Sequence, residues 1–339
     1  MASQTEIARL SNVSQSAVSR ILRGQAREFG ITDVTAERVK IIAEALDYKP
    51  NPGAQMLLGR QTKLIGVVIR SFEDRFLATV LDELNARALE SDYVLITVGL
   101  KEGQYRAREV NLLQAYRPDA FIVVGSTDFS HWGKDFLGSG KLIVQIGMAV
   151  DDPRVISCGT DEPKAAKLLV KHLYDLGHRR FGIIGDNSAV SRLRMNLFKM
   201  GLKEQPEPVA IPCVYLSDLK STAAGIDCAD HLMTDVMPAH WPTALIVTGD
   251  MIALGVLRRL SERGVSVPGT VSVASVGDID FASLVSPSLT TVHLPVRDMA
   301  ASSIQMIAGS LPHKSLLLAP QFMARESTGR PHSRADGTH

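Results

Sequence analysis

Residues Ser3–Leu22 read SQTEIARLSNVSQSAVSRIL, and the spacing of their apolar residues predicts two short helices joined by a tight turn. Ser3 followed by Glu6 forms a capping box, in which each side chain satisfies a free backbone N–H of the other residue. Asn12 interrupts the helical spacing, because asparagine can take left-handed backbone angles that most residues resist. Ser14 then caps the second helix. The stretch therefore predicts a helix-turn-helix unit.

The second helix carries its polar side chains on one face: Gln15, Ser16, Ser19 and Arg20. Such side chains reach base edges and phosphates when a helix lies in the major groove of DNA. We expect Gln15, Ser16 and Arg20 to contact bases. We expect Ser14 and Ser19 to contact phosphates. An ordinary helical hairpin with a polar outer face is the alternative, and this stretch alone does not decide between the two.

A third amphipathic helix and a linker follow. Thr32–Tyr48 has Thr32 as its cap, and Pro50 and Pro52 prevent the helix from running straight on. Gly53–Leu58 can form one short turn, and its apolar residues need a partner.

The whole series EIARLSNVSQSAVSRIL, TAERV, LDYKPNPGAQMLLGRQT and IGVV, with Glu326-Ser327-Thr328-Gly329 near the C-terminus, closely resembles the lac repressor/galactose repressor (LacI) family of bacterial transcription regulators. The resemblance covers nearly the whole chain. It implies a sequence-specific repressor of a catabolic operon that binds double-stranded DNA at a pseudo-palindromic operator. It also implies a homodimer under the allosteric control of a small-molecule effector.

The resemblance gives roles to two linker residues. Leu57 matches a leucine that wedges between base pairs in the minor groove, and Ala54 matches a small residue that lets paired linker helices approach the groove floor. The alternative is that these side chains pack on the rest of the protein. The segment Arg23–Ile31 is longer than in most of the family. It is either an inert insertion or a phosphate contact made through Arg27.

From Leu64 onward, apolar runs alternate with amphipathic stretches. The predicted strands are Leu64–Ile69, Tyr93–Val98, Ala120–Val124, Leu142–Ile146, Phe181–Ile184, Ala244–Val247 and Ser272–Val276. The predicted helices include Leu77–Leu89, Arg106–Ala115, Pro163–Leu176, Gly225–Thr234 and Met251–Arg263. This alternation predicts two doubly wound α/β lobes with parallel sheets. The resemblance implies the periplasmic-binding-protein type, with crossovers near Gly159–Asp161, Thr290–His293 and Leu317–Gln321.

We therefore expect an α/β protein with a small all-α head. The expected domains are a helix-turn-helix DNA-binding head at 1–49, a hinge helix or linker at 50–61, a two-lobed effector-binding and dimerisation core at 62–330, and a disordered tail at 331–339.

Composition limits the function. The net charge is only +1, so any DNA footprint must be local to the head. No apolar run is long enough to span a membrane, no signal region opens the chain, and the three cysteines are scattered without metal spacing, which predicts a reduced, cytoplasmic protein. The nine histidines are dispersed, and His178 is expected to be structural. We predict no metal, no cofactor and no catalytic residue.

The resemblance also indicates an effector site between the lobes. The candidate residues are Phe76, Leu77, Arg194, Lys220, Asp250 and Gly277. Arg194 matches an arginine that grips effector oxygens, with a solvated helix charge as its alternative. Asp250 has a helix N-cap as its alternative, and Phe76 and Leu77 have a place in the hydrophobic core.

Two departures from the family pattern concern effector charge. Gly277 stands where the family often has a ligand-facing aspartate, and Lys220 stands where an aromatic ring often stacks on a sugar. Losing an anion and gaining a cation favours an anionic effector, a sugar acid or a phosphorylated sugar.

The alternative function is a solute-binding or sensing protein whose helical head binds another protein, and an enzyme on the same two-lobed fold comes third. The paired modules Ser3–Leu22 and Asn51–Arg60 favour the regulator, because a solute receptor needs neither.

Overall fold

The computed structural model describes residues 3–48, 61–100, 107–125, 133, 135–150, 152–237 and 240–332. The chain divides into two compact units, Met1–Thr62 and Lys63–His339, which we call the head and the body.

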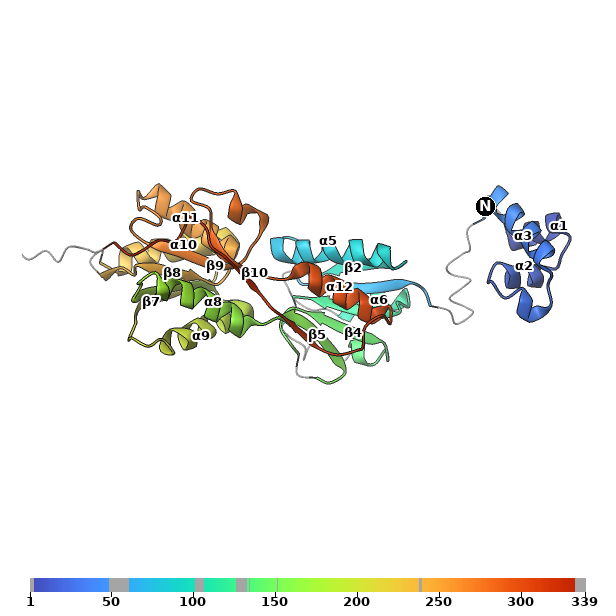
Figure 1. Ribbon diagram of the computed structural model, residues 1–339, viewed down its shortest axis with the longest axis horizontal. Coiled ribbons are helices and arrows are strands. Elements are labelled where there is room, and N and C mark those ends of the chain that lie inside the picture. Colours follow the sequence, from blue (N-terminus) through green and yellow to red (C-terminus); the bar gives the residue numbers. More distant parts are fainter. Residues whose placement is uncertain are drawn as a thin grey trace, which may run out of the picture. The chain divides into compact units, whose positions relative to one another are not determined.

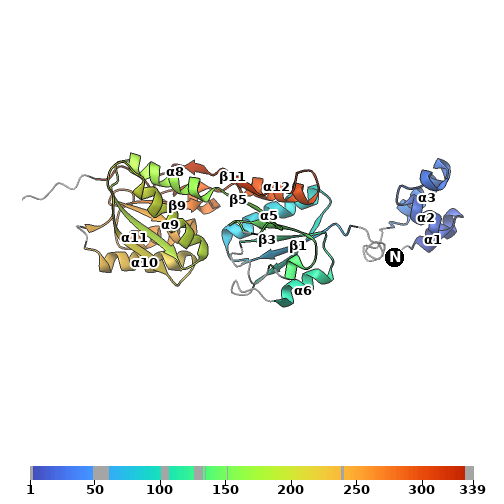
Figure 2. The same ribbon diagram turned by 90° about the horizontal axis from the view of Figure 1, so that it is seen from below.

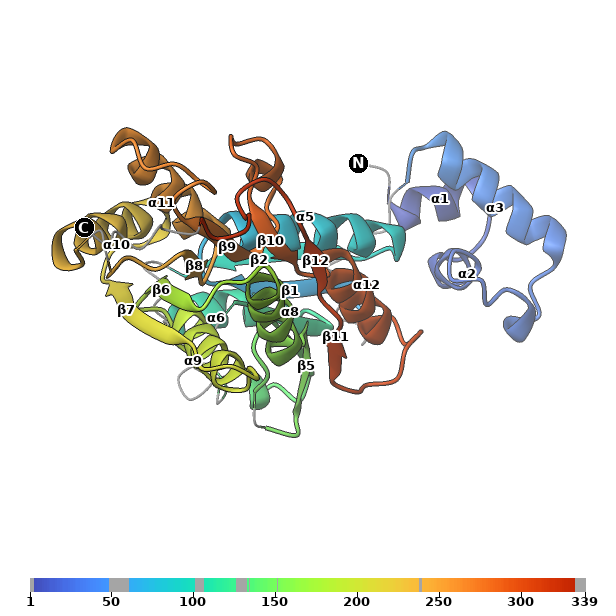
Figure 3. The ribbon, with the colours of Figure 1, turned by 60° about the vertical axis from the view of Figure 1, so that its left-hand side comes forward.

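The head contains three helices, α1 (Gln4–Ser11), α2 (Gln15–Ile21) and α3 (Asp33–Ala45), and a short 3₁₀ turn η1 (Arg27–Phe29) (Figure 3). The predicted caps form: side-chain oxygens of Ser3, Ser14 and Thr32 accept backbone N–H groups at 3.2, 3.2 and 3.3 Å. Within the described residues only the Ser3 half of its capping box is made. Asn12 ends α1 in the left-handed conformation, with φ of 53°. The predicted helix-turn-helix geometry is therefore present.

Packing of the three helices buries a small apolar core. Ile7, Val18 and Val39 are each 0% exposed, and they come one from each helix. Fully burying a side chain of this kind contributes roughly 1.5–3 kcal/mol. The core is what fixes α2 against α1 and α3, and it thereby fixes the direction of the polar face of α2.

The body contains two sheets, each with six strands. The first sheet is built from β1 (Leu64–Ile69), β2 (Val94–Gly99), β3 (Ala120–Val124), β4 (Leu142–Ile146), β5 (Val155–Thr160) and β11 (Leu316–Leu318), in the order β11-β5-β4-β3-β1-β2. All its pairings are parallel.

The second sheet is built from β6 (Arg180–Asp186), β7 (Ala210–Ser217), β8 (Ala244–Val247), β9 (Ser272–Gly277), β10 (Thr290–His293) and β12 (Gln321–Met323), in the order β12-β10-β9-β8-β6-β7. Its pairings are parallel except at the edge, where β12 runs antiparallel to β10. The sequence predicted parallel pairing only.

Helices cover both faces of each sheet. On the first sheet, α5 (Arg75–Glu90) and α12 (Val296–Ile307) cover one face and α6 (Ala107–Ala115) covers the other (Figure 2). On the second sheet, α8 (Glu162–Asp175) and α9 (Ala189–Lys203) cover one face, and α10 (Ser221–Asp235) and α11 (Asp250–Glu262) cover the other (Figure 1). A short 3₁₀ turn, η4 (Asp280–Ser283), follows β9. This is the predicted doubly wound architecture.

The predicted crossovers need one correction. Thr290–His293 is strand β10 itself, and its first three residues are buried; the chain passes to the other lobe after it, through Leu294-Pro295. The apolar patterns also did not predict β5 and β7. β7 is an edge strand with several exposed side chains, so it lacks the continuous apolar run of a central strand.

Two glycines let α10 and α11 approach unusually closely. A Cβ atom placed on Gly225 would lie 1.9 Å from the carbonyl oxygen of Ile252, and one placed on Gly255 would lie 2.1 Å from that of Thr222. Backbone atoms cannot move aside as a flexible side chain can. The two helices therefore pack at a separation that only glycine permits at these two positions.

Gly225→Ala is expected to destabilise the body by about 1–3 kcal/mol, because the added methyl overpacks the contact with α11. Gly201→Ala is the matched control: the new Cβ would lie 3.5 Å from Val170, and helix propensity favours alanine by about 1 kcal/mol. Urea denaturation followed by circular dichroism measures both. Equal midpoints for Gly225→Ala and the unsubstituted protein would contradict the close-packing account.

Candidate functional sites

The outer face of α2 presents the side chains that the sequence singled out. Ser14, Gln15 and Ser16 are exposed, and Ser19 and Arg20 are partly buried. The Ser14 hydroxyl caps the helix and lies 2.9 Å from that of Ser16. In the part of the chain that the structure describes, Arg20 makes no ion pair. Its N–H groups are therefore available to an acceptor outside the head.

The neighbouring arginines are already engaged. Arg23 donates to the carbonyl oxygen of Ser19 at 2.6 Å and to its hydroxyl at 2.7 Å. Arg27 pairs with Asp33 at 3.2 Å on an exposed surface. The Ser19 hydroxyl, expected to contact a phosphate, here also holds Arg23 in place.

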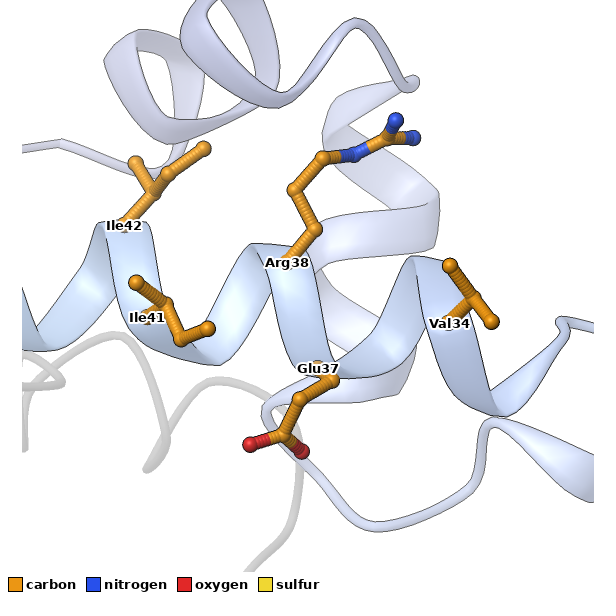
Figure 4. Close-up of a pocket in the computed structure, with 5 residues that line it drawn as sticks. All are labelled: Val34, Glu37, Arg38, Ile41 and Ile42. Carbon is orange, nitrogen blue, oxygen red and sulfur yellow. The ribbon is translucent and has the colours of Figure 1, made fainter.

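An apolar hollow on α3 was not anticipated. It is lined by Val34, Glu37, Arg38, Ile41 and Ile42 (Figure 4). Val34 and Ile41 are 79% and 58% exposed. The spacing of the sequence predicts an apolar face of this helix at Val39, Ile42, Ala43 and Leu46, all buried or partly buried, and Val34 and Ile41 lie outside that face.

Ala54 and Leu57, which the family resemblance assigns to the minor groove, lie outside the described residues. Most of the predicted hinge, from residue 50 to residue 60, lies outside them as well.

In the body, parallel strands of both sheets end at the predicted effector region. Ligands of doubly wound sheets bind at the carboxyl ends of strands. Contacts between the lobes there include an ion pair of Arg75 of α5 with Asp280 of η4 at 3.6 Å and the packing of Phe76 against both the first-lobe and the second-lobe cores. Leu77, by contrast, is 4% exposed and belongs to the first-lobe core, which is the alternative that the sequence left open.

Arg194 is held by a buried ion pair. Its Nε and Nη2 donate to the two carboxylate oxygens of Glu162 at 2.8 Å each, and its Nη1 donates to the carbonyl oxygen of Thr248 at 2.9 Å. The two side chains are only 10% and 17% exposed. Burial lowers the pKa of the Arg194 guanidinium, but the charge and hydrogen bonds of Glu162, together with the charges of Asp250 and Asp74, raise this pKa by more, so Arg194 stays charged. It is not the solvated helix charge of the alternative interpretation.

Glu162 is a residue that sequence reasoning missed. It lies 32 positions before Arg194, at the start of α8, and no spacing pattern connects the two. Its position means that the positive charge expected at Arg194 is already balanced within the protein.

Asp250 lies at the centre of a hydrogen-bond network. Its Oδ1 accepts the hydroxyls of Ser275 at 2.5 Å and Thr291 at 2.7 Å, and its Oδ2 accepts the backbone N–H of Ile279 at 2.8 Å. Gly249, and not Asp250, is the N-cap of α11. The N-cap alternative for Asp250 is therefore wrong.

Gly277 accommodates this network. Its φ of +152° disfavours a side chain, and a Cβ atom there would lie 3.0 Å from Oδ2 of Asp250. The next residue is Asp278. Its Oδ1 accepts a hydrogen bond from Nη2 of Arg325 at 2.6 Å, and its Oδ2 lies 3.0 Å from Nδ1 of His293. Burial raises the pKa of Asp278, but the hydrogen bonds from His293 and Arg325 outweigh it and hold this pKa below its ordinary value.

Lys220 is exposed at the N-cap of α10, and its side chain makes no capping bond. Lys220 and Arg194 were the two cations expected near the effector. Lys220 is thus exposed, and Arg194 is paired with Glu162.

His178 and Cys158 are buried and have a structural role. His178 is 1% exposed and lies 2.9 Å from both the Thr243 hydroxyl and the Gly329 carbonyl oxygen, as a structural histidine should. Cys158 is buried, and burial raises the pKa of its thiol to about 11. Within the described residues, no group of three or more metal-binding side chains gathers, and no helix is long and apolar enough to cross a membrane.

Comparison with known proteins agrees with this arrangement. Residues 5–51 match the family model of bacterial regulatory proteins of the lacI family, and residues 170–328 match that of periplasmic binding protein-like domains. The chain therefore carries a DNA-binding domain of the lacI family. It is a DNA-binding transcription regulator with an effector-binding domain, and the resemblance seen in the sequence is confirmed.

Curated relatives extend over nearly the whole chain. The HTH-type transcriptional repressor PurR of Haemophilus influenzae is 26% identical over 340 residues, which covers 96% of this chain and 98% of that protein. The ribose operon repressor of the same species is 26% identical over 349 residues, with the same coverage. Among solved structures, the lac repressor dimer bound to operator and the anti-inducer ONPF has a TM-score of 0.84 at 22% identity, covering 97% of this chain and 99% of that one. This last likeness concerns the fold.

Glu162→Gln is expected to destabilise the body by about 3–5 kcal/mol, because it leaves the buried charge of Arg194 without its counter-ion. The matched control is Glu204→Gln, which breaks an exposed pair with Lys167 and should change stability by less than about 1 kcal/mol. Urea denaturation compares the two. Similar small effects from both substitutions would mean that the Arg194–Glu162 pair is not a structural element of the body.

Proposed function

We propose that this lacI-family regulator represses a catabolic operon by binding a pseudo-palindromic operator as a homodimer, and that a small molecule bound in the body controls it. The observation that carries the proposal is the polar outer face of α2, on which Arg20 makes no ion pair with any described residue. A helix of this kind, packed by its other face on two supporting helices, has the form of a recognition helix for the major groove.

The DNA contacts divide by chemistry. Gln15, Ser16 and Arg20 offer side-chain donors and acceptors that suit base edges, whereas the hydroxyls of Ser14 and Ser19 suit phosphate oxygens. Arg23 and Arg27 have partners within the head, so the proposal gives them no base contact.

A dimer is proposed because one head reads only one half-site. Two-fold symmetry of the protein then matches two-fold symmetry of the operator. The paired hinges, with Leu57 as the wedge and Ala54 beside it, belong to the same proposal and rest on the family resemblance.

The effector is proposed to bind beside Arg194, Asp250 and Gly277, with Phe76 as an apolar wall and Lys220 at the rim. The charges favour an uncharged, hydroxyl-rich molecule over the anion that the sequence favoured. Arg194 is balanced by Glu162, and Asp74 pairs with Arg70 at 2.5 Å, while Asp250 has only uncharged donors. Among the described residues, an anion would therefore meet the carboxylate of Asp250 and no buried cation that lacks a carboxylate partner. The names of relatives point the same way: one is a ribose operon repressor, and one solved relative is a CelR–cellobiose complex.

The proposal assigns the chain a cytoplasmic, regulatory role and no catalysis. A solute receptor with a protein-binding head remains the alternative function, and it would need no polar recognition face on α2.

Arg20→Ala should weaken binding to the cognate operator by about 1–3 kcal/mol and relax the preference for one base pair in each half-site, because a bidentate base contact is lost. The operator is first recovered from a random DNA pool by the unsubstituted protein. Fluorescence anisotropy then compares this variant with Arg38→Ala, a head arginine on α3 whose loss should leave base preference unchanged. Unchanged affinity and preference in Arg20→Ala would refute the groove assignment.

Effector charge can be tested by calorimetry with paired neutral and anionic sugar ligands, glucose against gluconate and fructose against fructose phosphate. At an effective dielectric of about 20, one unpaired carboxylate about 4 Å from an anion contributes on the order of 4 kcal/mol of repulsion, so the uncharged member should bind more tightly. Tighter binding of the anions, abolished by Lys220→Ala, would instead restore the anionic effector.

A further inference from the structure

The segment between α2 and α3, longer than in most of the family, is folded and anchored to the head. Ala26 is 9% exposed and packs in the head core. The backbone N–H of Ile31 returns to the carbonyl oxygen of Ala26 at 2.9 Å, and Gly30 takes a left-handed φ of 69° to close the turn. The turn between these two residues is therefore held in one conformation.

This turn places Phe29 against the recognition face. Phe29 is 49% exposed, so the head core does not account for its ring. The guanidinium carbon of Arg20 lies 4.0 Å from the centroid of the ring, in the geometry of a cation–π contact. An aromatic side chain from the long segment thus lies directly beneath the one arginine of α2.

Stacking restrains Arg20 without using its hydrogen-bond donors. The attraction acts on the flat face of the guanidinium, whereas its N–H groups point outward in the plane. An exposed arginine otherwise loses much rotamer freedom on binding, and a preorganised one loses less. The ring can therefore hold Arg20 ready for the planar, two-bond contact that guanine O6 and N7 offer in the major groove.

The neighbouring arginines show why this contact matters. Arg23 is held by Ser19, and Arg27 is held by Asp33, in each case through the N–H groups that a base or phosphate would need. Among these three arginines, only Arg20 is held through its face.

We propose that Phe29 is a positioning residue that determines specificity: its ring orients Arg20 for a bidentate contact with a guanine of the operator. The long segment between α2 and α3 is then part of the reading apparatus and not an inert insertion. This inference rests on the proposed function, since it concerns how Arg20 reads DNA.

The test compares Phe29→Leu, which keeps an apolar side chain without a π face, with Phe29→Tyr, which restores the ring. Binding is measured by fluorescence anisotropy on the operator recovered by the unsubstituted protein and on its single-base variants. Phe29→Leu should reduce discrimination at the base pair read by Arg20 by about 2- to 30-fold, the range expected for a cation–π contact, and should leave affinity for unrelated DNA unchanged. Phe29→Tyr should keep the original discrimination, because tyrosine presents a π face of the same kind to the guanidinium.

A double-mutant cycle separates positioning from a general structural effect. In an Arg20→Ala background, Phe29→Leu should have no further effect on discrimination, because the residue through which it acts is gone. Ile41→Ala, another exposed apolar residue of the head at 58% exposure, is the control and should leave base preference unchanged. Circular dichroism confirms that each head is folded.

Undiminished discrimination in Phe29→Leu, or an equal further loss in the Arg20→Ala background, would overturn the inference while specific DNA binding by the unsubstituted protein still supports the proposed function. Absence of specific DNA binding by the unsubstituted protein would instead defeat the proposed function itself, and the inference with it.

Discussion

The body depends on one buried carboxylate. Asp250 is 3% exposed and ties together three separate places in the chain, because it accepts hydrogen bonds from β9, from β10 and from the loop that follows β9. A buried carboxylate is tolerated only when its oxygens are satisfied in this way. Gly277 has to be small and to take positive φ so that the strand can end against this group. The geometry at the carboxyl edge of the second sheet follows from that constraint.

The same edge explains how charge is arranged for an effector. The structure balances Arg194 with Glu162 before any ligand arrives, and it ties Asp278 to Arg325. Preformed pairs of this kind present fixed hydrogen-bond directions with little net charge. Such a surface distinguishes the positions of hydroxyl groups better than it distinguishes charges. A ligand that breaks one of these ion pairs leaves a buried charge uncompensated, which costs free energy. Arg194 considered without Glu162 would add a positive charge to the site, which is one reason why the sequence alone favoured an anionic effector.

Local chemistry explains what the sequence could predict. The caps at Ser3, Ser14 and Thr32 depend on residues three positions apart, and the strands β1, β3 and β4 are largely apolar, so both were predicted from pattern. Contacts between residues far apart in the sequence were not predicted. Glu162 meets Arg194 only through the folded second lobe, and nothing in the spacing identifies it. β10 was taken for a connection because the family resemblance placed a crossover near Thr290–His293, and its pairing with β9 and with β12 defines it as a strand.

Because the head carries little net charge, the proposed recognition of DNA depends on a few short-range contacts. The head, Met1–Thr62, contains eight Lys and Arg residues and six Asp and Glu residues, so its net charge of +2 is small for attracting DNA from a distance. Long-range steering by a basic surface is therefore weak, and affinity has to come from hydrogen bonds that form at contact. Under these conditions the orientation of a single guanidinium matters more than the number of arginines. In the proposed function, Arg23 and Arg27 are held within the head, while Arg20 of α2 makes no ion pair with any described residue. This arrangement favours discrimination between sequences over non-specific attraction.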